Sequence, residues 1–319
     1  MKFKKFTLAT FALLSAFSLA ACSSSKEKSD KVSVGIIQYA EHGALTAARE
    51  GFLEALEDAG YKEGKNLTVD YQNSQGDQAN LQTMVEQLAG EHDVNFAIAT
   101  PAAQALLNVD ADTPTVFTAV TDPISAGLVD SMEKPGGNMT GSIDATNVTG
   151  QIDMLLKVVP NAKTVGIFYN SSEVNSQVQA EAAQKALEKA GIKVVVKTVT
   201  TTNDVQQVMT SLAGQVDALY LPTDNTVAST ASTIGEILKA KKIPAIGSDE
   251  AYLEGVLFTY GVDFHGIGVQ AGEMAVKMLK GYKAADLPVQ EPKVAAIAVN
   301  EDMAKALGYD VETIKALNQ

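Results

Sequence analysis

A repeated stretch constrains the fold of this chain more than any other feature of its sequence. The segment "VGIIQYAEHGALTAAREGFLEALEDAG", Val34 to Gly60, aligns without a gap on "VGIFYNSSEVNSQVQAEAAQKALEKAG", Val165 to Gly191. Further along, "FAIATPAA" parallels "ALYLPTDN", and "TPTVFTAV" parallels "IPAIGSDE", in the same order. Similar segments in the same order indicate two similar bodies joined in series.

Each half alternates short apolar runs with amphipathic segments. In the first half, residues 32–39, 67–73, 94–100 and 113–120 have the pattern of buried strands, and the segments between them carry apolar residues at helical spacing. Strands that alternate with helices form right-handed βαβ units and a parallel sheet. We therefore predict an α/β fold of two similar parallel-sheet lobes, with a hinge and a central cleft. One long doubly wound sheet is the alternative.

The predicted boundaries follow from the composition of the connecting segments. "EKPGGNMTGSIDATN", Glu133 to Asn147, is rich in turn residues and is typical of a connector. A strand, a helix and a further strand follow the second half, and they indicate additional crossings between the lobes. We predict lobe 1 from residues 32–142 and about 262–287, and lobe 2 from 143–261 and about 288–319. Gly266, Gly268 and Gly272 miss the spacing of a dinucleotide-binding loop and favour close helix packing.

The N-terminal segment has the layout of an export signal. Lys2, Lys4 and Lys5 precede an apolar run from Phe6 to Ala21, and residues 1–21 are predicted to be a signal peptide. The tetrad Leu19-Ala20-Ala21-Cys22 resembles a bacterial lipobox, in which the cysteine is lipidated and becomes the first mature residue. A plain signal peptide with a chance cysteine is the alternative. Residues 22–31 are then the lipidated cysteine and a polar, flexible tether.

Composition excludes several classes of function. The formal net charge of −13 argues against nucleic acid as a partner, because phosphates need a basic face. Cys22 is the only cysteine, which excludes disulfides within the chain and a zinc–thiolate site. His42, His92 and His265 are too scattered to indicate a metal, and no nucleophile motif, P-loop or cofactor motif is present. We expect no metal and no cofactor.

Ligands of parallel α/β sheets bind beyond the carboxyl ends of the strands. The residues that follow each predicted strand, with two from the connectors, are therefore the candidate ligand-binding residues. In the first half these are Gln38, Tyr39, Glu41, His42, Thr100, Ala102, Ala103, Thr118, Thr121 and Asp122. In the second half they are Tyr169, Asn170, Ser171, Thr223, Asp224, Asn225, Ser248, Asp249 and Glu250, and the connectors add Asp144 and Tyr260.

The stretch "ATPAAQA" has the features of an anion-binding helix start. Thr100 is expected to be the N-cap, Pro101 suits the first helical position, and the Ala102 and Ala103 amides are left open. A ligand carboxylate would fit there, although Thr100 could also merely cap its own helix. Opposite it, Asp224 is a candidate acceptor for a ligand ammonium, with Asp249 as a second candidate. The alternative for Asp224 is that it caps a helix that begins near Thr226.

Aromatic residues near these strand ends are candidates for a side-chain pocket. They are Tyr39, Tyr169, Tyr252 and Tyr260, and we expect half of them to be ordinary core residues. The chain contains no tryptophan, which weakens a sugar-binding interpretation because such sites often stack sugars on indole rings.

The motifs "VGIIQYAEHGALTAAREGF", "ATPAAQA", "TAVTDPISAGLV", "NMTGS", "YNSSEVNS" and "LPTDNTVAS" resemble the substrate-binding lipoproteins of ABC importers, in the family that contains tryptophan/tyrosine-type binding proteins. The resemblance covers nearly the whole mature chain. It implies a type I periplasmic-binding-protein fold with three crossovers, and a ligand that is an aromatic amino acid: tryptophan, tyrosine or phenylalanine. It also implies that Thr100 and the Ala102 and Ala103 amides hold the ligand carboxylate.

The resemblance implies a monomeric, non-enzymatic protein on the outer face of the cytoplasmic membrane, anchored there through Cys22. Its partners would be a small-molecule ligand, a membrane permease and a cytoplasmic ATPase. Branched-chain amino acids and small amides remain alternative ligands, and a ligand sensor for a membrane receptor is an alternative role. An anchored hydrolase with Asp122 or Asp249 as base is the enzyme alternative.

Overall fold

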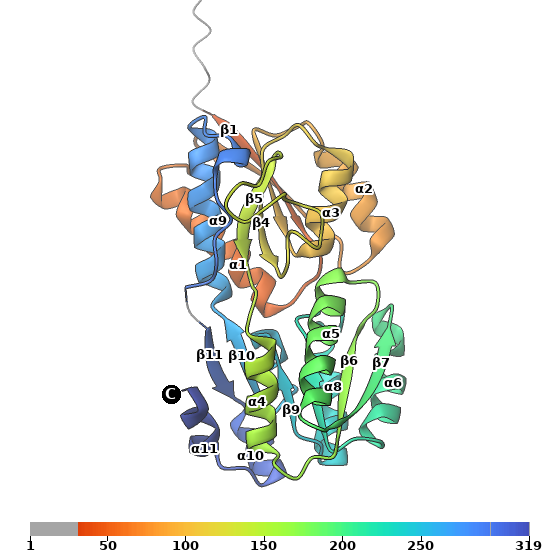
Figure 1. The fold of residues 1–319 in the computed structure, drawn as a ribbon. Coiled ribbons are helices and arrows are strands. Elements are labelled where there is room, and N and C mark those ends of the chain that lie inside the picture. The colour runs from red at the N-terminus through yellow and green to blue at the C-terminus, as the bar shows by residue number, and fades with distance from the viewer. Residues whose placement is uncertain (1–30, 294, 319) are drawn as a thin grey trace, which may run out of the picture. The chain divides into compact units, whose positions relative to one another are not determined.

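The computed structural model describes residues 31–293 and 295–318, so the predicted signal peptide, Cys22 and most of the tether lie outside the described residues. Two separate sheets organise the described chain, which rules out the single long sheet (Figure 1). The α/β fold with two parallel-dominated sheets is thereby confirmed. We call each sheet with its helices a lobe.

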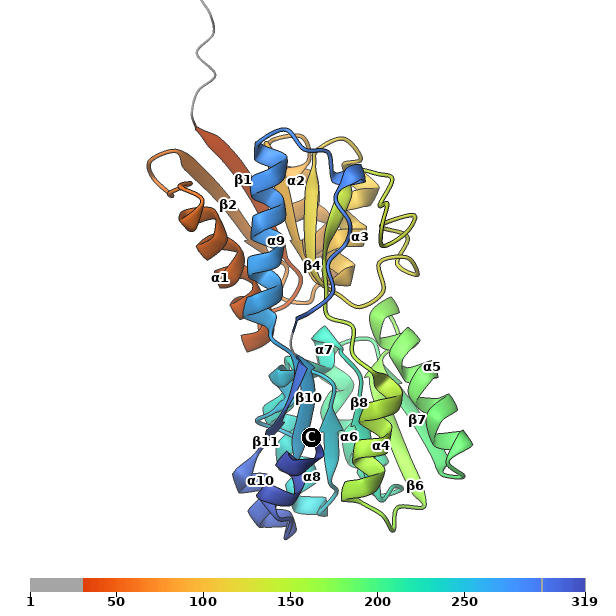
Figure 2. The ribbon, with the colours of Figure 1, turned by 60° about the vertical axis from the view of Figure 1, so that its left-hand side comes forward.

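Lobe 1 contains a five-stranded parallel sheet in the order β2-β1-β3-β4-β5. Its strands are β1 (Val32–Gln38), β2 (Leu67–Asn73), β3 (Val94–Ile98), β4 (Thr115–Val120) and β5 (Met139–Ile143). Its helices are α1 (Gly43–Asp58), α2 (Gln78–Leu88), α3 (Thr100–Val109), α9 (Phe264–Leu279) and the short η3 (Ala284–Asp286). Helices α1 and α9 pack on each other on one side of the sheet, and α2 packs on α3 on the other (Figure 2).

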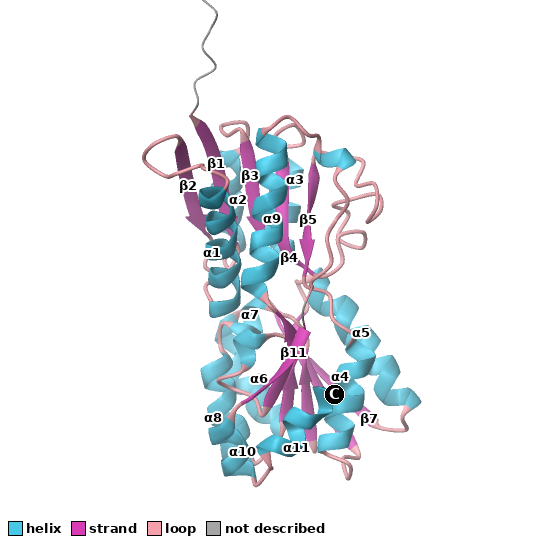
Figure 3. Ribbon diagram, turned by 90° about the vertical axis from the view of Figure 1, so that its left-hand side faces the viewer, coloured by secondary structure: helices cyan, strands magenta, loops and turns pink. Residues whose placement is uncertain are grey.

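Lobe 2 contains a six-stranded sheet in the order β11-β10-β9-β8-β6-β7, in which only β11 is antiparallel to its neighbour. Its strands are β6 (Thr164–Asn170), β7 (Lys193–Val199), β8 (Ala218–Leu221), β9 (Ala245–Gly247), β10 (Phe258–Val262) and β11 (Ala295–Val299). Its helices are α4 (Val148–Val158), α5 (Val174–Lys189), α6 (Val205–Ala213), α7 (Asn225–Ala228), α8 (Ala231–Lys241), α10 (Glu301–Leu307) and α11 (Val311–Lys315), with short turns η1 (Thr202–Asp204), η2 (Glu250–Tyr252) and η4 (Ala316–Asn318). The helices flank the sheet (Figure 3).

The structure carries the repeat seen in the sequence. The order β7-β6-β8-β9-β10 in lobe 2 is the order β2-β1-β3-β4-β5 of lobe 1. Helices α1 and α5 begin and end at aligned positions of the two repeats, and each is followed by a glycine in the left-handed region, Gly60 at φ 94° and Gly191 at φ 76°. Such a conformation is accessible to glycine without a steric penalty, and it ends both helices at the same point.

The prediction that residues 133–147 form only a connector was wrong in part. Strand β5 lies inside this segment and pairs with β4 at the edge of the first sheet. Its middle residue is Gly141, where a Cβ atom would meet the carbonyl oxygen of Phe117. Glycine is therefore needed for close strand approach, although in sequence it resembles a turn signal.

The chain passes between the lobes at three places: from β5 to α4, from β10 to α9, and between η3 and β11 (Figures 1 and 2). Two buried glutamines tie these crossings. Gln151 Nε2 donates to the Tyr260 carbonyl (2.7 Å) and to Thr146 Oγ1 (3.0 Å), while Gln270 Nε2 donates to Gln290 Oε1 (3.0 Å). Because Gln290 still bridges β5 at Ser142, the third crossing lies beyond it, a little later than the predicted residue 288.

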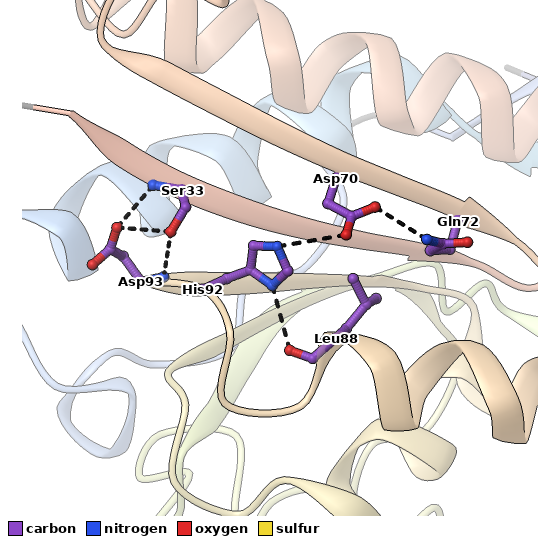
Figure 4. A network of polar contacts seen from close by, with 6 residues as sticks. All are labelled: Ser33, Asp70, Gln72, Leu88, His92 and Asp93. Atoms are coloured by element: carbon purple, nitrogen blue, oxygen red, sulfur yellow. Dashed lines mark hydrogen bonds and ion pairs between the residues drawn. The ribbon is translucent and has the colours of Figure 1, made fainter.

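A polar network fastens the amino-terminal edge of the lobe 1 sheet (Figure 4). Asp93 Oδ2 accepts from the backbone N (2.8 Å) and from Oγ (3.0 Å) of Ser33. His92 Nδ1 lies 3.3 Å from the Leu88 carbonyl, which can only accept, so Nδ1 carries a proton, and Nε2 lies 3.8 Å from Asp70 Oδ2. These contacts hold β1, β2 and β3 at the edge remote from the strand ends where ligands bind. His92 therefore has a structural role.

Candidate functional site

Residues that follow the strands of the two sheets meet between the lobes. Gln179 of α5 donates from Nε2 to Thr121 Oγ1 (3.4 Å), and the side chain of Tyr39 faces Thr226 of α7. A cavity of about 400 Å³ opens at this junction and takes its lining from both lobes. It is lined by Ala40, Glu41, Gln75, Gly76, Asp77, Thr201, Thr202, Asn203, Thr226 and Ser229. The polar strand ends and this cavity define the candidate site.

The start of α3 differs from the predicted N-cap geometry. The N-cap is Ala99, with φ 84°, and Thr100 is already the first helical residue, so the prediction for Thr100 was wrong by one position. The Ala103 amide donates to the Ala99 carbonyl (3.1 Å) and is therefore not open, contrary to prediction. The Ala102 amide keeps a first-turn position that has no intrahelical acceptor. Thr100 Oγ1 is buried without a hydrogen-bond partner among the described residues.

The end of β4 shows the same kind of strain. Ala119 has φ 55°, beside a register shift between Phe117 and Val120. A non-glycine residue in the left-handed region is uncommon, and such residues gather at binding sites. Ala99 and Ala119 end neighbouring strands, so both distortions point to one place at the carboxyl edge of the sheet. Thr118, by contrast, lies in the lobe 1 interior, where Oγ1 pairs with Ser142 Oγ (2.8 Å).

Two buried acids lie on the hinge side of the site. Asp144 follows β5 and Asp249 follows β9, and each is 2 % exposed. Burial raises the pKa of Asp144 from 3.8 to about 6, against a hydrogen bond from Thr121 that lowers it. Burial, with a smaller contribution from the charge of Asp144, raises the pKa of Asp249 to about 7. Asp144 Oδ1 has no hydrogen-bond partner among the described residues, and no described ion pair involves either acid.

A second acidic cluster surrounds the start of α7. Asp224 caps this helix: its Oδ1 accepts from the Val227 amide (2.7 Å) and its Oδ2 from the Asn170 amide (2.6 Å). Both carboxylate oxygens therefore have backbone partners, which favours the capping alternative over ammonium binding. Burial, and then the charge of Glu173, raise the pKa of Asp224 well above its usual value. The ligand role predicted for Asp224 remains a prediction.

Glu173 and Asn175 were not predicted from the sequence. Glu173 is fully buried and accepts from Asn225 Nδ2 (2.7 Å), the Asn225 amide (3.0 Å) and Thr226 Oγ1 (2.8 Å). Asn175 is 3 % exposed, and its Oδ1 has no hydrogen-bond partner among the described residues. The internal repeat of the sequence could have indicated Glu173 as a candidate. Glu173 aligns with His42, and the two residues are the N-caps of equivalent helices.

Tyr39 and His42 follow β1 and lie at this junction. Burial lowers the pKa of His42 to about 4, so the imidazole is neutral at physiological pH. Asn225 lies beside the ring, but neither ring nitrogen completes a hydrogen bond within the described residues. Burial, and then the charge of Glu173, raise the pKa of Tyr39 to about 12. His42, Tyr39 and Glu173 thus belong to one region of the junction.

Several other predicted residues have partners within their own lobe. Gln38 Nε2 donates to the Ala40 carbonyl (2.8 Å), Asp122 Oδ2 accepts from Ser125 Oγ (2.6 Å), and Ser248 Oγ donates to the Leu221 carbonyl (3.0 Å). Tyr252 is a core residue whose hydroxyl donates to the Pro222 carbonyl (3.0 Å), and Tyr260 lies beside the crossings. These contacts explain the polar side chains without a ligand.

The described residues contain no helix that could cross a bilayer and no group of three or more acidic, histidine or cysteine side chains arranged to hold a metal ion.

Comparison with known proteins agrees with this geometry. The sequence matches the ABC transporter substrate binding protein family over residues 33–315. The chain belongs to this family. The substrate-binding protein described here is 39 % identical over 287 residues to the tyrosine-binding protein of Clostridioides difficile strain R20291, a match that covers 89 % of this chain and 83 % of the relative.

Two solved structures of relatives differ in their ligand state. A crystal structure of an ABC domain from Streptococcus pneumoniae in complex with L-Trp is 36 % identical, covers 90 % of this chain and 98 % of its own, and superposes with a TM-score of 0.86. The ligand-free, open structure of a Clostridium difficile substrate-binding protein with adhesive properties is 44 % identical, covers 88 % and 95 %, and superposes with a TM-score of 0.67. This chain therefore superposes better on the ligand-bound relative, although the open relative is closer in sequence.

Family membership also decides between the broad alternatives. This substrate-binding protein of an ABC transporter is extracytoplasmic and is not an enzyme, so the anchored-hydrolase alternative is set aside.

Proposed function

We propose that the protein is the lipid-anchored receptor of an ABC importer and captures an aromatic amino acid by closure of its two lobes. The observation that carries this proposal is a set of buried polar atoms without hydrogen-bond partners at the junction of the lobes: Thr100 Oγ1, Asp144 Oδ1, Asn175 Oδ1 and both ring nitrogens of His42. An unpartnered buried polar atom costs about 1–3 kcal/mol, so native proteins keep few of them without a purpose.

The chemistry of these groups fits a zwitterion. Thr100 Oγ1 and the Ala102 amide are donors at a helix start, and they suit a carboxylate. Asp144 and Asp249 are buried acids without a described cationic partner, and they suit an ammonium group. We therefore assign the ammonium to this pair in preference to Asp224, whose oxygens both accept backbone hydrogen bonds.

The order of the strands indicates how the proposed ligand is oriented along the lobe 1 sheet. Along the lobe 1 sheet, β3 with Thr100 lies between β1 with His42 and β4, and β5 with Asp144 lies at the hinge-side edge. A carboxylate at Thr100 and an ammonium at Asp144 leave the ligand side chain pointing toward the β1 end. There Tyr39 and His42 face Asn225 and Thr226 of lobe 2.

The aromatic class is supported by the relatives. One is named a tyrosine-binding protein, and another was crystallised with L-Trp. Closure follows from ligand groups that both lobes hold, because a ligand shifts the open–closed equilibrium only by its difference in affinity for the two states. The closed form would then deliver the ligand to a permease driven by a cytoplasmic ATPase.

The ligand proposal is tested by isothermal titration calorimetry of the purified protein with the twenty amino acids. We expect binding of aromatic amino acids with an affinity at least about tenfold above that of aliphatic ones. Because the chain has no tryptophan, indole emission excited through the protein's tyrosines should rise when L-tryptophan is added. Absence of heat and of thermal stabilisation with every aromatic amino acid would refute the proposal.

We also propose that Cys22 is lipidated and that residues 22–31 tether a monomeric body to the outer face of the cytoplasmic membrane. The motif Leu19-Ala20-Ala21-Cys22 and the polar segment after it support this proposal. We expect Cys22→Ser to release the protein into the medium or to leave it unprocessed, as seen by cell fractionation. A Ser23→Ala variant is the matched control, and membrane retention of the Cys22→Ser protein in mature form would contradict the proposal.

A further inference from the structure

Asn175, in the first turn of α5, holds a polar atom that the proposed carboxylate and ammonium contacts do not use. The side chain is 3 % exposed, and its Oδ1 atom has no hydrogen-bond partner among the described residues. Its Nδ2 atom donates to the Thr223 carbonyl (2.9 Å), to Glu173 Oε2 (3.2 Å) and to Ser176 Oγ (3.2 Å). The nitrogen of the amide therefore has hydrogen-bond partners, and the oxygen has none among the described residues.

These partners fix which end of the amide is the oxygen. Asparagine O and N atoms are assigned from their hydrogen bonds, and a carbonyl oxygen can only accept. A flipped amide would place its oxygen against the Thr223 carbonyl and the carboxylate of Glu173, which are both acceptors. The atom without a partner is therefore the carbonyl oxygen, and it requires a donor.

The location of Asn175 places that oxygen at the ligand side-chain end of the junction. Its neighbours Thr223 and Glu173 lie at the carboxyl edge of the lobe 2 sheet. The charge of Glu173 acts on Tyr39 at the end of β1, so this side of the junction is the one toward which a ligand side chain points. The acids assigned to the ammonium lie elsewhere along the sheets: Asp144 follows β5 at the edge of the first sheet, and Asp249 follows β9, two strands from the β6 strand that leads into α5.

We propose that Asn175 Oδ1 accepts a hydrogen bond from a donor at the far end of the ligand side chain, so that the protein selects tyrosine and tryptophan over phenylalanine. This inference rests on the proposed binding of an aromatic amino acid. A phenol O–H and an indole N–H are both donors, whereas a phenyl ring carries none. A site built around a buried acceptor rejects a ligand that leaves the acceptor unpartnered.

The surrounding charge favours a donor over an acceptor. Burial and the carboxylates of Glu173 and Asp224 raise the pKa of the neighbouring Tyr39 phenol to about 12. The same surroundings keep the phenol of a bound tyrosine protonated, so it can donate to Asn175 Oδ1. An anionic ligand tail would meet repulsion from the same carboxylates.

The experiment compares ligands that differ in a single group. In the wild-type protein we expect calorimetric Kd values at least about tenfold lower for tyrosine than for phenylalanine, and for tryptophan than for 3-benzothienylalanine, in which sulfur replaces the indole N–H. In Asn175→Ala, both ratios should fall toward one. A purely structural role would weaken all four ligands together and keep the ratios.

Asn95→Ala is the matched control, because Asn95 is a buried asparagine near the start of β3, at the opposite edge of the lobe 1 sheet. Its ratios should equal those of the wild type. Wild-type ratios below about threefold for both ligand pairs would overturn the inference, and this comparison needs no variant to fold. It would leave the proposed function intact, whereas loss of all aromatic binding would remove both.

Discussion

Single residues at the ends of the strands determine what the junction of the lobes can bind. The strand-end rule pointed to Thr100, Asp249 and His42, because carboxyl ends of parallel strands share one edge, and the connector between the halves added Asp144. The rule could not tell which polar groups have hydrogen-bond partners within the protein. Asp224 caps α7, and the Ala103 amide donates within its own helix. Side-chain partners depend on tertiary packing, so the hydrogen bonds of Glu173 and the unpartnered oxygen of Asn175 became visible only in the structure.

The Thr100 hydroxyl can be tested by an isosteric change. Thr100→Val should lower aromatic amino-acid affinity by about tenfold or more, because it removes a donor to a carboxylate. The free energy of unfolding should not fall, since the hydroxyl has no partner among the described residues. Thr115→Val is the reciprocal control: Thr115 Oγ1 donates to the Thr113 carbonyl (3.0 Å) far from the site, so stability should fall by about 1 kcal/mol while affinity stays unchanged. Calorimetry and urea unfolding measure the two quantities.

The acid pair can be tested by neutralisation. Asp144→Asn and Asp249→Asn should each lower affinity by about thirtyfold or more, because each leaves the ligand ammonium short of a buried carboxylate. Asp249 accepts from the Ala251 amide at 2.7 Å, and the amide oxygen that Asp249→Asn introduces can accept the same hydrogen bond, so the fold should persist. Asp217→Asn is the control, since Asp217 binds the Lys163 and Thr164 amides just before β8, at the remote edge. Unchanged affinity in both test variants would refute the assignment.

Pairs of elements set how closely the layers of a lobe approach. Helices α1 and α9 pack through small residues: a Cβ on Gly268 would meet the Ala48 carbonyl oxygen, and a Cβ on Gly272 would lie 2.6 Å from the Phe52 carbonyl oxygen. Close helix packing was the role expected for these glycines from the sequence. Gly266 differs, because its neighbour is the capping carboxylate of Asp263. The helices were predictable from the periodic spacing of their apolar residues. Strand β5 was not, because its middle residue is Gly141 and the surrounding segment is rich in turn residues.

The contact between α1 and α9 gives a stability prediction. Gly268→Ala should lower the free energy of unfolding by about 1–3 kcal/mol, because the added methyl group has only backbone to displace. Gly43→Ala at the start of α1 is the matched control: it has no neighbour within 4 Å and should be neutral or slightly stabilising. Thermal unfolding of the two variants measures the difference. Equal melting temperatures of the two variants would show that α1 and α9 can move apart without loss of stability.

The whole molecule concentrates acidic side chains where its lobes meet. Asp144, Asp249, Asp224 and Glu173 are buried there, and no described ion pair involves any of them. The two-lobe architecture followed from the repeat in the sequence, but the meeting of these acids required the arrangement of both sheets. Such a field favours a ligand with a positive group and opposes anions.

Affinity should therefore depend on pH. With pKa values raised by burial to about 6 for Asp144 and about 7 for Asp249, both acids are ionised at pH 8 and protonated at pH 5. We expect the Kd of an aromatic amino acid to rise at least about tenfold from pH 8 to pH 5, with proton release on binding at about pH 6.5. His42, with a pKa of about 4, stays neutral throughout. Calorimetry in buffers of different ionisation enthalpy measures both effects, and a flat profile would contradict the acid assignment.

The same shifts act on the stability of the ligand-free protein. Between the usual 3.8 and the raised pKa values, the folded state holds protons that the unfolded chain has released. The contribution of these two groups to the free energy of unfolding therefore decreases as pH rises from about 4 to about 7. Asp144→Asn should flatten that part of the pH–stability curve, whereas the Asp217→Asn control should keep it. Urea unfolding at several pH values makes the comparison.

Helix α9, late in the chain, packs against α1, the first helix of the described residues, so lobe 1 has no complete interior until nearly all of the sequence has been synthesised. A ribosome that is still making the first part of lobe 2 holds a first lobe with one face uncovered, and lobe 2 in turn lacks β11, α10 and α11 until α9 has been made. Late completion of both lobes suits a polypeptide that must pass through a narrow export channel while still unfolded. The interleaving that joins the lobes thus also sets the order in which they can be completed: lobe 1 with η3, and lobe 2 only with β11 and the helices that follow it.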